Sequence, residues 1–271
     1  MRLLVTGANG FLARALQPLL PAAWDTVALT HASAAPDAYR RRYQDIAALL
    51  AGEPAFDGIL HLAAQIRAPA NGPSGYLPAN VELPSALVRA YPDARHVLAS
   101  STSVYGDDAS LPIGIATPCR PEHPYGRSKL AGEQAVRDAR SHAIVRFSSL
   151  LGRGMHPSTF VPRIIDDART RGIITLLGSG ERRQNYLDVR DAAAMCLRAL
   201  QSPASFVTLG IGPGEWSNNE VAALVAARTG ARVVHEGSDS SPSRTYTQAG
   251  CIDLGENVRL LDVTLDWLIK P

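Results

Sequence analysis

The chain has 271 residues, of which 46% are hydrophobic and 19% charged, and its 27 Lys+Arg against 25 Asp+Glu leave a net charge of +2. This composition is typical of a globular protein with a sizeable core, and so balanced a charge argues against nucleic acid as a partner. No apolar run approaches the ~20 residues that a transmembrane helix needs, so no membrane partner is expected.

The cysteines give no sign of a metal site. Cys119, Cys196 and Cys251 lie far apart and match neither a metal-ligand spacing nor a disulfide framework. A sparse, odd number of cysteines suits a reducing compartment. A strand-like segment begins at Leu3, which leaves no room for a signal peptide. We therefore expect a cytoplasmic protein without a bound metal.

Short apolar runs alternate with helical stretches through the first 150 residues. The predicted strands are residues 3–6, 26–29, 58–62, 96–99 and 143–146. The predicted helices are residues 11–20, 42–51, 79–90 and 125–140. The arginine run at 40–42 is interpreted as a solvated helix face. Such alternation predicts right-handed βαβ units and an α/β fold with a Rossmann-like, doubly wound parallel sheet.

After residue 152 the pattern loosens, and glycines and prolines punctuate shorter elements. We predict helices at 189–200, 220–228 and 258–268, and a strand at 205–209. The expected organisation is a dinucleotide-binding domain at 1–152 and, at 153–271, mostly a smaller substrate-binding lobe with some elements returning to the core. Such a lobe would lie over the carboxyl edge of the sheet, where open α/β sheets bind ligands.

A glycine turn follows the first predicted strand and opens a helix. Gly7 permits the tight turn, Gly10 lets backbone N–H groups approach a pyrophosphate, and small Ala13 allows close packing of the helix on the sheet. The helix N-terminus would face the phosphates with its positive end. The residues of this turn expected to contact a dinucleotide are Gly7, Asn9, Gly10, Phe11 and Leu12.

The end of the second predicted strand lacks the acidic residue that selects NAD by binding the ribose 2′-hydroxyl. No carboxylate follows that strand until Asp37, whereas Arg40, Arg41 or His31 could meet a 2′-phosphate. The sequence therefore leans towards NADP over NAD. Further cofactor contacts are expected from Asp45 and Ile46 at the adenine, although Asp45 could equally be a helix cap, and from Leu62, Ala63 and Ala64.

Tyr125 and Lys129 are the candidate catalytic pair. Residues four apart lie on one face of a helix, so the Lys129 ammonium can approach the Tyr125 hydroxyl. That cation, with the charge of an oxidised nicotinamide, would lower the pKa of Tyr125 from about 10 and make it a usable base. Upstream, Ser101 is the hydroxyl expected to polarise the substrate oxygen, with Thr102 as the alternative.

These motifs together resemble the extended short-chain dehydrogenase/reductase family, the NAD(P)-dependent sugar epimerase/dehydratase group. The resemblance rests on TGANGF, HLAA, PANVELP, SSTSVYG, PYGRSKLAGE and GSGERRQNYLDVRDAA, and spans nearly the whole chain. It implies that Ser101, Tyr125 and Lys129 form a catalytic triad and that Asn80, Phe147 and Ser148 flank the cofactor. It also implies substrate contacts from Thr102, Ser149, Phe160 and Gln184.

The chain departs from the family pattern in ways that bear on the reaction and the substrate. Dehydratases of the group have Asp-Glu directly after the catalytic hydroxyl residue, whereas Thr102-Ser103 follow Ser101 here, which argues against a sugar 4,6-dehydratase. Members often have Asn at Ser149 and a diphosphate-binding Arg at Gln184. The arginines that could replace this lost charge are Arg153, Arg163, Arg182, Arg183 and Arg244.

The sequence leaves several functions open. The leading hypothesis is an NAD(P)-dependent epimerase or oxidoreductase that transfers hydride at a sugar hydroxyl/ketone, with a nucleotide sugar as substrate. The alternatives are an NADPH-dependent 4-keto-sugar reductase, a dehydrogenase of a free sugar, uronate or other small carbonyl compound, and a cofactor-sensing binding protein without catalysis. A homodimer through the outward residues Leu130, Ala131 and Ala135 is a further expectation from the resemblance.

Overall fold

The structure is a computed structural model that describes residues 1–30, 39–251, 253 and 258–270. The described strands are β1 Arg2–Thr6, β2 Asp25–Leu29, β3 Arg41–Tyr43, β4 Gly58–His61, β5 Arg95–Ser101, β6 Ser141–Phe147, β7 Ser149–Leu151, β8 Ile173–Leu177, β9 Arg183–Asp188, β10 Phe206–Gly210, β11 Glu215–Ser217 and β12 Arg232–Glu236. The described α-helices are α1 Phe11–Leu16, α2 Ile46–Gly52, α3 Leu83–Ala90, α4 Pro124–Arg137, α5 Phe160–Arg171, α6 Val189–Gln201, α7 Asn218–Thr229 and α8 Leu261–Ile269.

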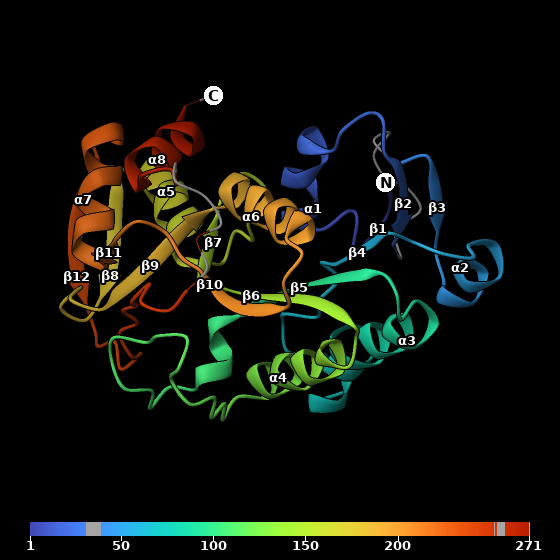
Figure 1. Cartoon of the computed structure of the whole chain (residues 1–271). Helices are drawn as coiled ribbons and strands as arrows, with labels where there is room; N and C mark the ends of the chain where they lie inside the picture. Colours follow the sequence, from blue (N-terminus) through green and yellow to red (C-terminus); the bar gives the residue numbers. More distant parts are fainter. Residues whose placement is uncertain (31–38, 252, 254–257, 271) are drawn as a thin grey trace.

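Within these residues, seven parallel strands form the main sheet in the order β10-β6-β5-β4-β1-β2-β3. The chain places β2 and β3 on one side of β1 and the later strands on the other (Figure 1). Connections therefore diverge between β1 and β4, which makes this the switch point where open α/β sheets bind ligands. The structure confirms the predicted Rossmann-like, doubly wound sheet.

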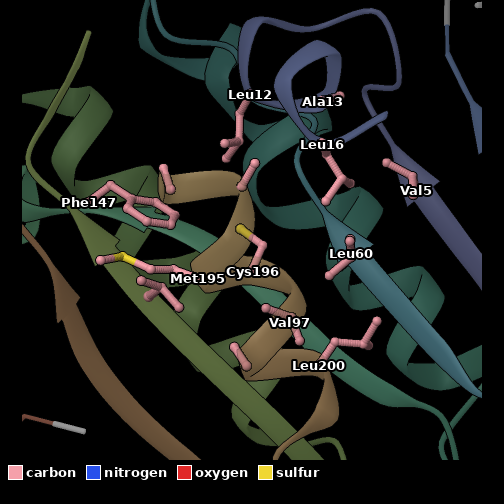
Figure 2. Packing of buried hydrophobic residues seen from close by; sticks show 14 of the residues in the cluster. Val5, Leu12, Ala13, Leu16, Leu60, Val97, Phe147, Met195, Cys196 and Leu200 are labelled. Atoms are coloured by element: carbon pink, nitrogen blue, oxygen red, sulfur yellow. The ribbon is translucent and has the colours of Figure 1, made fainter. Parts of the chain in front are cut away.

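Helices cover both faces of this sheet, with α1 and α6 on one face and α3 and α4 on the other (Figure 1). In Figure 2, α6 lays Cys196 and Leu200 against Val97 and Leu60 of the strands beneath, while Leu16 of α1 packs alongside. Fully burying an aliphatic side chain contributes about 1.5–3 kcal/mol. This packing fixes the strands, and with them the positions of the loops at their carboxyl ends.

A smaller lobe follows β6 in the chain and has its own apolar core, which includes Ile164 and Val225. In the part of this lobe that the structure describes, β9 pairs with β7 and β11, and β8 pairs with β12. Strand β10 returns to the main sheet beside β6. None of the helices in the described residues is long and apolar enough to cross a membrane.

The predicted helix over residues 42–51 is wrong at its start. Arg41–Tyr43 pair with β2 as the edge strand β3, and α2 begins only at Ile46. The Asp45 carboxylate caps this helix by accepting a hydrogen bond from Ala48 N at 2.9 Å. Arg41 and Arg42 therefore lie on an edge strand and not on a helix face. The sequence analysis missed β3 because three residues are too few to show the alternating hydrophobic pattern of a strand, and because its partner β2 lies in a different segment of the chain.

Other predicted helices have different ends. The helix predicted over 11–20 ends at Leu16 and continues as the 3-10 turn Gln17–Leu19, because Pro18 lacks the backbone donor that an α-helix needs. The helix predicted over 79–90 opens as the π-helical turn Pro78–Glu82 before α3. Helix α5 was not predicted, because glycines and prolines near its ends favoured a loop.

Candidate functional site

A cavity of about 1630 Å³ opens along the carboxyl edge of the main sheet. It exceeds the roughly 300–1,000 Å³ of an ordinary small-molecule pocket, so it has room for a ligand of two linked parts. It runs from the turn after β1, past the switch point, to α4. The predicted site residues on its wall are Gly7, Asn9, Gly10, Phe11, Leu12, Asp45, Ile46, Leu62, Ala63, Ala64, Ser101, Thr102, Tyr125, Lys129, Phe147, Ser148 and Ser149.

The glycine turn closes one end of the cavity. Gly7 has φ of +65°, its N–H donates to Leu29 O at 2.8 Å, and its carbonyl accepts from Gly10 N at 2.7 Å. A Cβ on Gly7 would lie 2.6 Å from Ala63 Cα, so no side chain fits between the loops after β1 and β4. This contact holds the backbone at the switch point open to a ligand's phosphates, which fits a dinucleotide.

The basic residues behind the predicted preference for NADP point elsewhere. The Arg40 guanidinium donates to Ala22 O at 3.1 Å, and Arg40 is not on the cavity wall. Arg41 forms ion pairs with Asp25 and Glu53 at 2.5 and 2.9 Å. The Arg40 side chain turns towards the loop before β2, so its contact with the cofactor stays a prediction that this geometry does not favour. His31 lies outside the described residues.

Ser101, Tyr125 and Lys129 line the same cavity as the glycine turn. Ser101 ends β5, and its Oγ accepts from Ser103 N at 3.1 Å and donates to Ser103 Oγ at 3.0 Å. Helix α4 begins at Pro124, where His123 Nδ1 accepts a hydrogen bond from Tyr125 N at 3.2 Å. The cap sets where α4 starts, and the helix then presents Tyr125 and Lys129 one turn apart to the cavity.

The ionisation of the pair is set by burial. Burial raises the pKa of Tyr125 to about 12, although its hydrogen bond with Ser101 acts the other way. Burial also lowers the pKa of Lys129 to about 8, and Glu133 opposes this. The predicted lowering of the Tyr125 pKa needs the charge of an oxidised nicotinamide as well as that of Lys129, and in the chain alone burial prevails. The Lys129 Nζ group donates to Ala99 O at 2.8 Å. Tyr125 by itself is a neutral phenol.

Asn80 does not lie on the cavity wall, in contrast to its predicted contact with the cofactor. Its side chain is buried, accepts from Gln65 N, and donates to Gln65 O and Ser128 Oγ, each at 2.9 Å. Ser128 Oγ in turn donates to Tyr125 O at 2.8 Å. Asn80 therefore ties the loop after β4 to the start of α4, and acts on the site through the backbone of Tyr125.

A second cavity of about 180 Å³ contains the remaining substrate candidates. It is lined by Thr102, Ser103, Ser149, Arg182, Gln184, Asn185, Arg244 and Tyr246. Phe160 lines neither cavity. It begins α5 and packs into the core of the smaller lobe, with the Arg163 guanidinium 6.0 Å from its ring centre. The substrate contact of Phe160 stays a prediction.

Several wall residues were missed by the sequence analysis. Arg14 and residues 154–159, between β7 and α5, line the large cavity, and Tyr246 lines the small one. Tyr246 Oη donates to Thr102 Oγ1 at 3.0 Å across 144 positions of sequence. Arg14 follows the glycine turn by one helical turn, which was an available signal. Tyr246 had none, because only the fold brings its loop to β5.

The sheet, the glycine turn at its switch point and the cavity define a Rossmann-fold protein with a dinucleotide-type site. The NAD dependent epimerase/dehydratase family model matches residues 3–212, so the chain belongs to that family. This confirms the resemblance inferred from the motifs and establishes an enzyme family that depends on NAD.

Relatives and solved structures agree with this assignment. The UDP-glucose 4-epimerase of Streptomyces lividans is 31% identical over 159 residues, which cover 52% of this chain and 48% of the relative. The chain spans 36–50% of the lengths of the first curated relatives that it matches. The structure of MoeE5 in complex with UDP-glucose and NAD is 27% identical, has a TM-score of 0.80, and covers 100% of this chain and 98% of that one. The NAD dependent NDP-hexosamine 5,6-dehydratase TunA shares the fold, with a TM-score of 0.81 at 23% identity, covering 100% of this chain and 98% of that one.

Proposed function

We propose that this protein is an NAD-dependent epimerase that acts on a nucleotide sugar by reversible hydride transfer at a hydroxyl-bearing carbon. The observation that carries the proposal is that Ser101, Tyr125 and Lys129 line the same cavity as the Gly7 turn. The similarity to an NAD- and UDP-glucose-binding structure over the whole chain supports the nucleotide sugar as substrate.

The described residues fit a nicotinamide dinucleotide. Gly7 provides the close backbone approach that phosphates need, Asp45 and Ile46 line the distal end, and Lys129 lies at the catalytic end. When bound, the nicotinamide supplies a hydride acceptor and donor. NAD is proposed over NADP because neither Arg40 nor Arg41 points into the cavity.

The chain's own residues then move the proton and hold the reacting oxygen. Ser101 Oγ hydrogen-bonds the substrate oxygen, and Tyr125 takes the hydroxyl proton in one direction and returns it in the other. Lys129, at a pKa of about 8, carries positive charge near neutral pH and favours the phenolate once a second cation is near. Burial of both side chains strengthens these electrostatic effects.

An epimerase is preferred to a reductase because the case for an exchanging NADPH weakens with Arg40 and Arg41 placed elsewhere. Water elimination would need an acid and a base directly after Ser101. Thr102 and Ser103 occupy those positions, and the Thr102 hydroxyl already accepts a hydrogen bond from Tyr246. We therefore propose that the protein is not a 4,6-dehydratase.

Replacing Tyr125 with Phe tests the proposal. The change removes the acid/base oxygen and leaves the ring packed near Tyr76, whose ring centre lies 6.1 Å away. Turnover of UDP-glucose or UDP-glucuronate, followed by product analysis, should fall by roughly 10²–10⁴-fold, with NAD affinity nearly unchanged. Tyr76→Phe is the matched control and should keep most activity. Turnover that survives in Tyr125→Phe would rule out the mechanism.

A further inference from the structure

The small cavity adjoins the catalytic hydroxyls. Thr102, Ser103 and Ser149 line both cavities, so the small one opens from the large one beside Ser101. Tyr246 closes it from the smaller lobe through its hydrogen bond to Thr102 Oγ1. A group bound there would belong to the part of the substrate that carries the reacting hydroxyl.

Its charged groups are mostly cationic. Arg182 is half-buried, and its Nε donates to Pro242 O at 3.2 Å. Among the described residues, Arg183 pairs with Glu220 and Arg244 with Asp107, whereas no carboxylate lies within ion-pair distance of Arg182. Arg244 bonds Gly106 O and pairs with Asp107, whose side chain is 69% exposed, so solvent screens that pair. In the part of the chain that the structure describes, the cavity therefore holds one cation, Arg182, that forms no ion pair, beside a second, Arg244, whose ion pair is screened by solvent.

The nearby acids have other hydrogen-bond partners. Glu215 Oε1 accepts from Tyr246 N at 2.6 Å, and Asp239 Oδ1 accepts from Ser241 N at 2.9 Å. Hydrogen bonds with Ser241, and to a smaller extent the charge of Arg182, lower the pKa of Asp239, but Asp239 and Arg182 form no ion pair in the described residues. Neutral donors complete the wall. The Gln184 side chain has no hydrogen-bond partner among the residues that the structure describes, and Ser149 lies beside it on the cavity wall. An oxygen-rich anion would satisfy Arg182 and these donors together.

We propose that the small cavity binds a carboxylate that the sugar carries next to the reacting hydroxyl, which makes the substrate an acidic, uronate-type sugar. The planar fork of Arg182 matches the two oxygens of a carboxylate. A volume of about 180 Å³ accommodates such a group but not a diphosphate with its attached nucleoside. This inference rests on the proposed function and names its substrate class.

The carboxylate proposal is tested by measuring the affinity of matched ligands with isothermal titration calorimetry. The protein is the NAD-loaded Tyr125→Phe variant, in which turnover is stopped. The probes are UDP-glucuronate against UDP-glucose, glucuronate against glucose, and UDP alone. The variants are Arg182→Met, Arg182→Lys and, as a control, Arg163→Met. Arg163 lies outside both cavities and pairs only weakly with Asp167 at 4.0 Å.

The expected result is that the acid binds at least about tenfold tighter than its neutral partner. Arg182→Met should remove this preference, Arg182→Lys should restore part of it, and Arg163→Met should keep it. Affinity for UDP-glucose should change less than about twofold.

If Arg182→Met weakens UDP and both UDP-sugars equally, the cavity binds a phosphate and the carboxylate assignment is wrong. The absence of any acid preference in either pair also overturns it. Failure of the proposed function would look different, because hydride transfer to NAD would then be missing in the unmodified chain even where the acid preference is present.

Discussion

Tyr125 has a pKa of about 12 because burial disfavours its phenolate. Its role as a base therefore depends on a positive charge that this chain does not supply alone. We expect oxidised NAD to lower the Tyr125 pKa, and NADH, whose nicotinamide is neutral, to lower it much less. The measurement is the tyrosinate absorbance of the wild type minus that of Tyr125→Phe, titrated with pH in each cofactor. Equal midpoints in NAD and NADH would contradict this role of the cofactor's charge.

The lowered pKa of buried Lys129 implies that the free energy of unfolding depends on pH. Its pKa is about 8 in the folded chain and about 10.4 in an unfolded one, so between these values the unfolded state holds the proton that the folded state has lost. Because the unfolded state binds more protons in this window, the contribution of Lys129 to the free energy of unfolding becomes more favourable as the pH rises. Relative to Lys129→Met, the wild type should become more stable by on the order of 1–2 kcal/mol between pH 8 and 9.5, measured by urea unfolding. A constant difference would refute the burial effect.

At the scale of elements, a buried network joins α4 to β5 and β6 beneath the catalytic residues. Glu133 Oε1 accepts from Ser100 Oγ at 2.6 Å, and both Glu133 oxygens accept from Arg146, at 2.9 and 2.7 Å. Arg146 also donates to Tyr105 Oη at 2.9 Å. Ser100 and Glu133 neighbour Ser101 and Lys129 along their elements, so this network fixes where the catalytic groups lie.

Glu133→Ala should reduce the free energy of unfolding by about 3–5 kcal/mol, because it leaves the Arg146 charge buried and unpaired. Chemical denaturation of the variant measures this loss. Adding Arg146→Met should recover much of it, since the lone charge is then gone. Asp93→Ala is the control: its pair with Arg140 is more than 70% exposed on both sides and should contribute little. A similar cost for Asp93→Ala and Glu133→Ala would show that burial is not the cause.

Much of the candidate site was accessible from the sequence, for physical reasons that differ between elements. The Gly7 turn, β5 and α4 are local structures, so strand, turn and cap signals sufficed to place Ser101, Tyr125 and Lys129 on them. Edge strand β3 was not predicted, because three residues are too few to show an alternating hydrophobic pattern and its pairing with β2 is a tertiary contact. Arg182 and Tyr246 could not be assigned to one pocket, because only packing of the smaller lobe brings their loops to β5.

At the scale of the whole molecule, the cavity joins the sheet to the smaller lobe, since its wall includes both the Gly7 turn and the segment before α5. A ligand that spans it stabilises both parts against unfolding. The proposed homodimer would add a further contact on α4, where Leu130, Ala131 and Ala135 are each half-buried by the monomer. Equilibrium sedimentation distinguishes a dimer from a monomer and would decide whether this residual apolar surface is covered.

The preference for NAD can be tested on the intact chain by its thermal unfolding. A ligand at 100 times its Kd adds about 2.7 kcal/mol to the free energy of unfolding. We expect NAD at saturating concentration to raise Tm by several degrees and NADP to raise it much less, because Arg40 and Arg41 are bonded away from the cavity. Gly7→Ala should abolish the NAD shift, since its Cβ would lie 2.6 Å from Ala63 Cα at a φ of +65°. Gly172→Ala is the matched control, because Gly172 has the same φ but no atom within 4 Å of its Cβ position. It should therefore lower the starting Tm through backbone strain while keeping the NAD shift, and a larger shift with NADP would reverse the assignment of the cofactor.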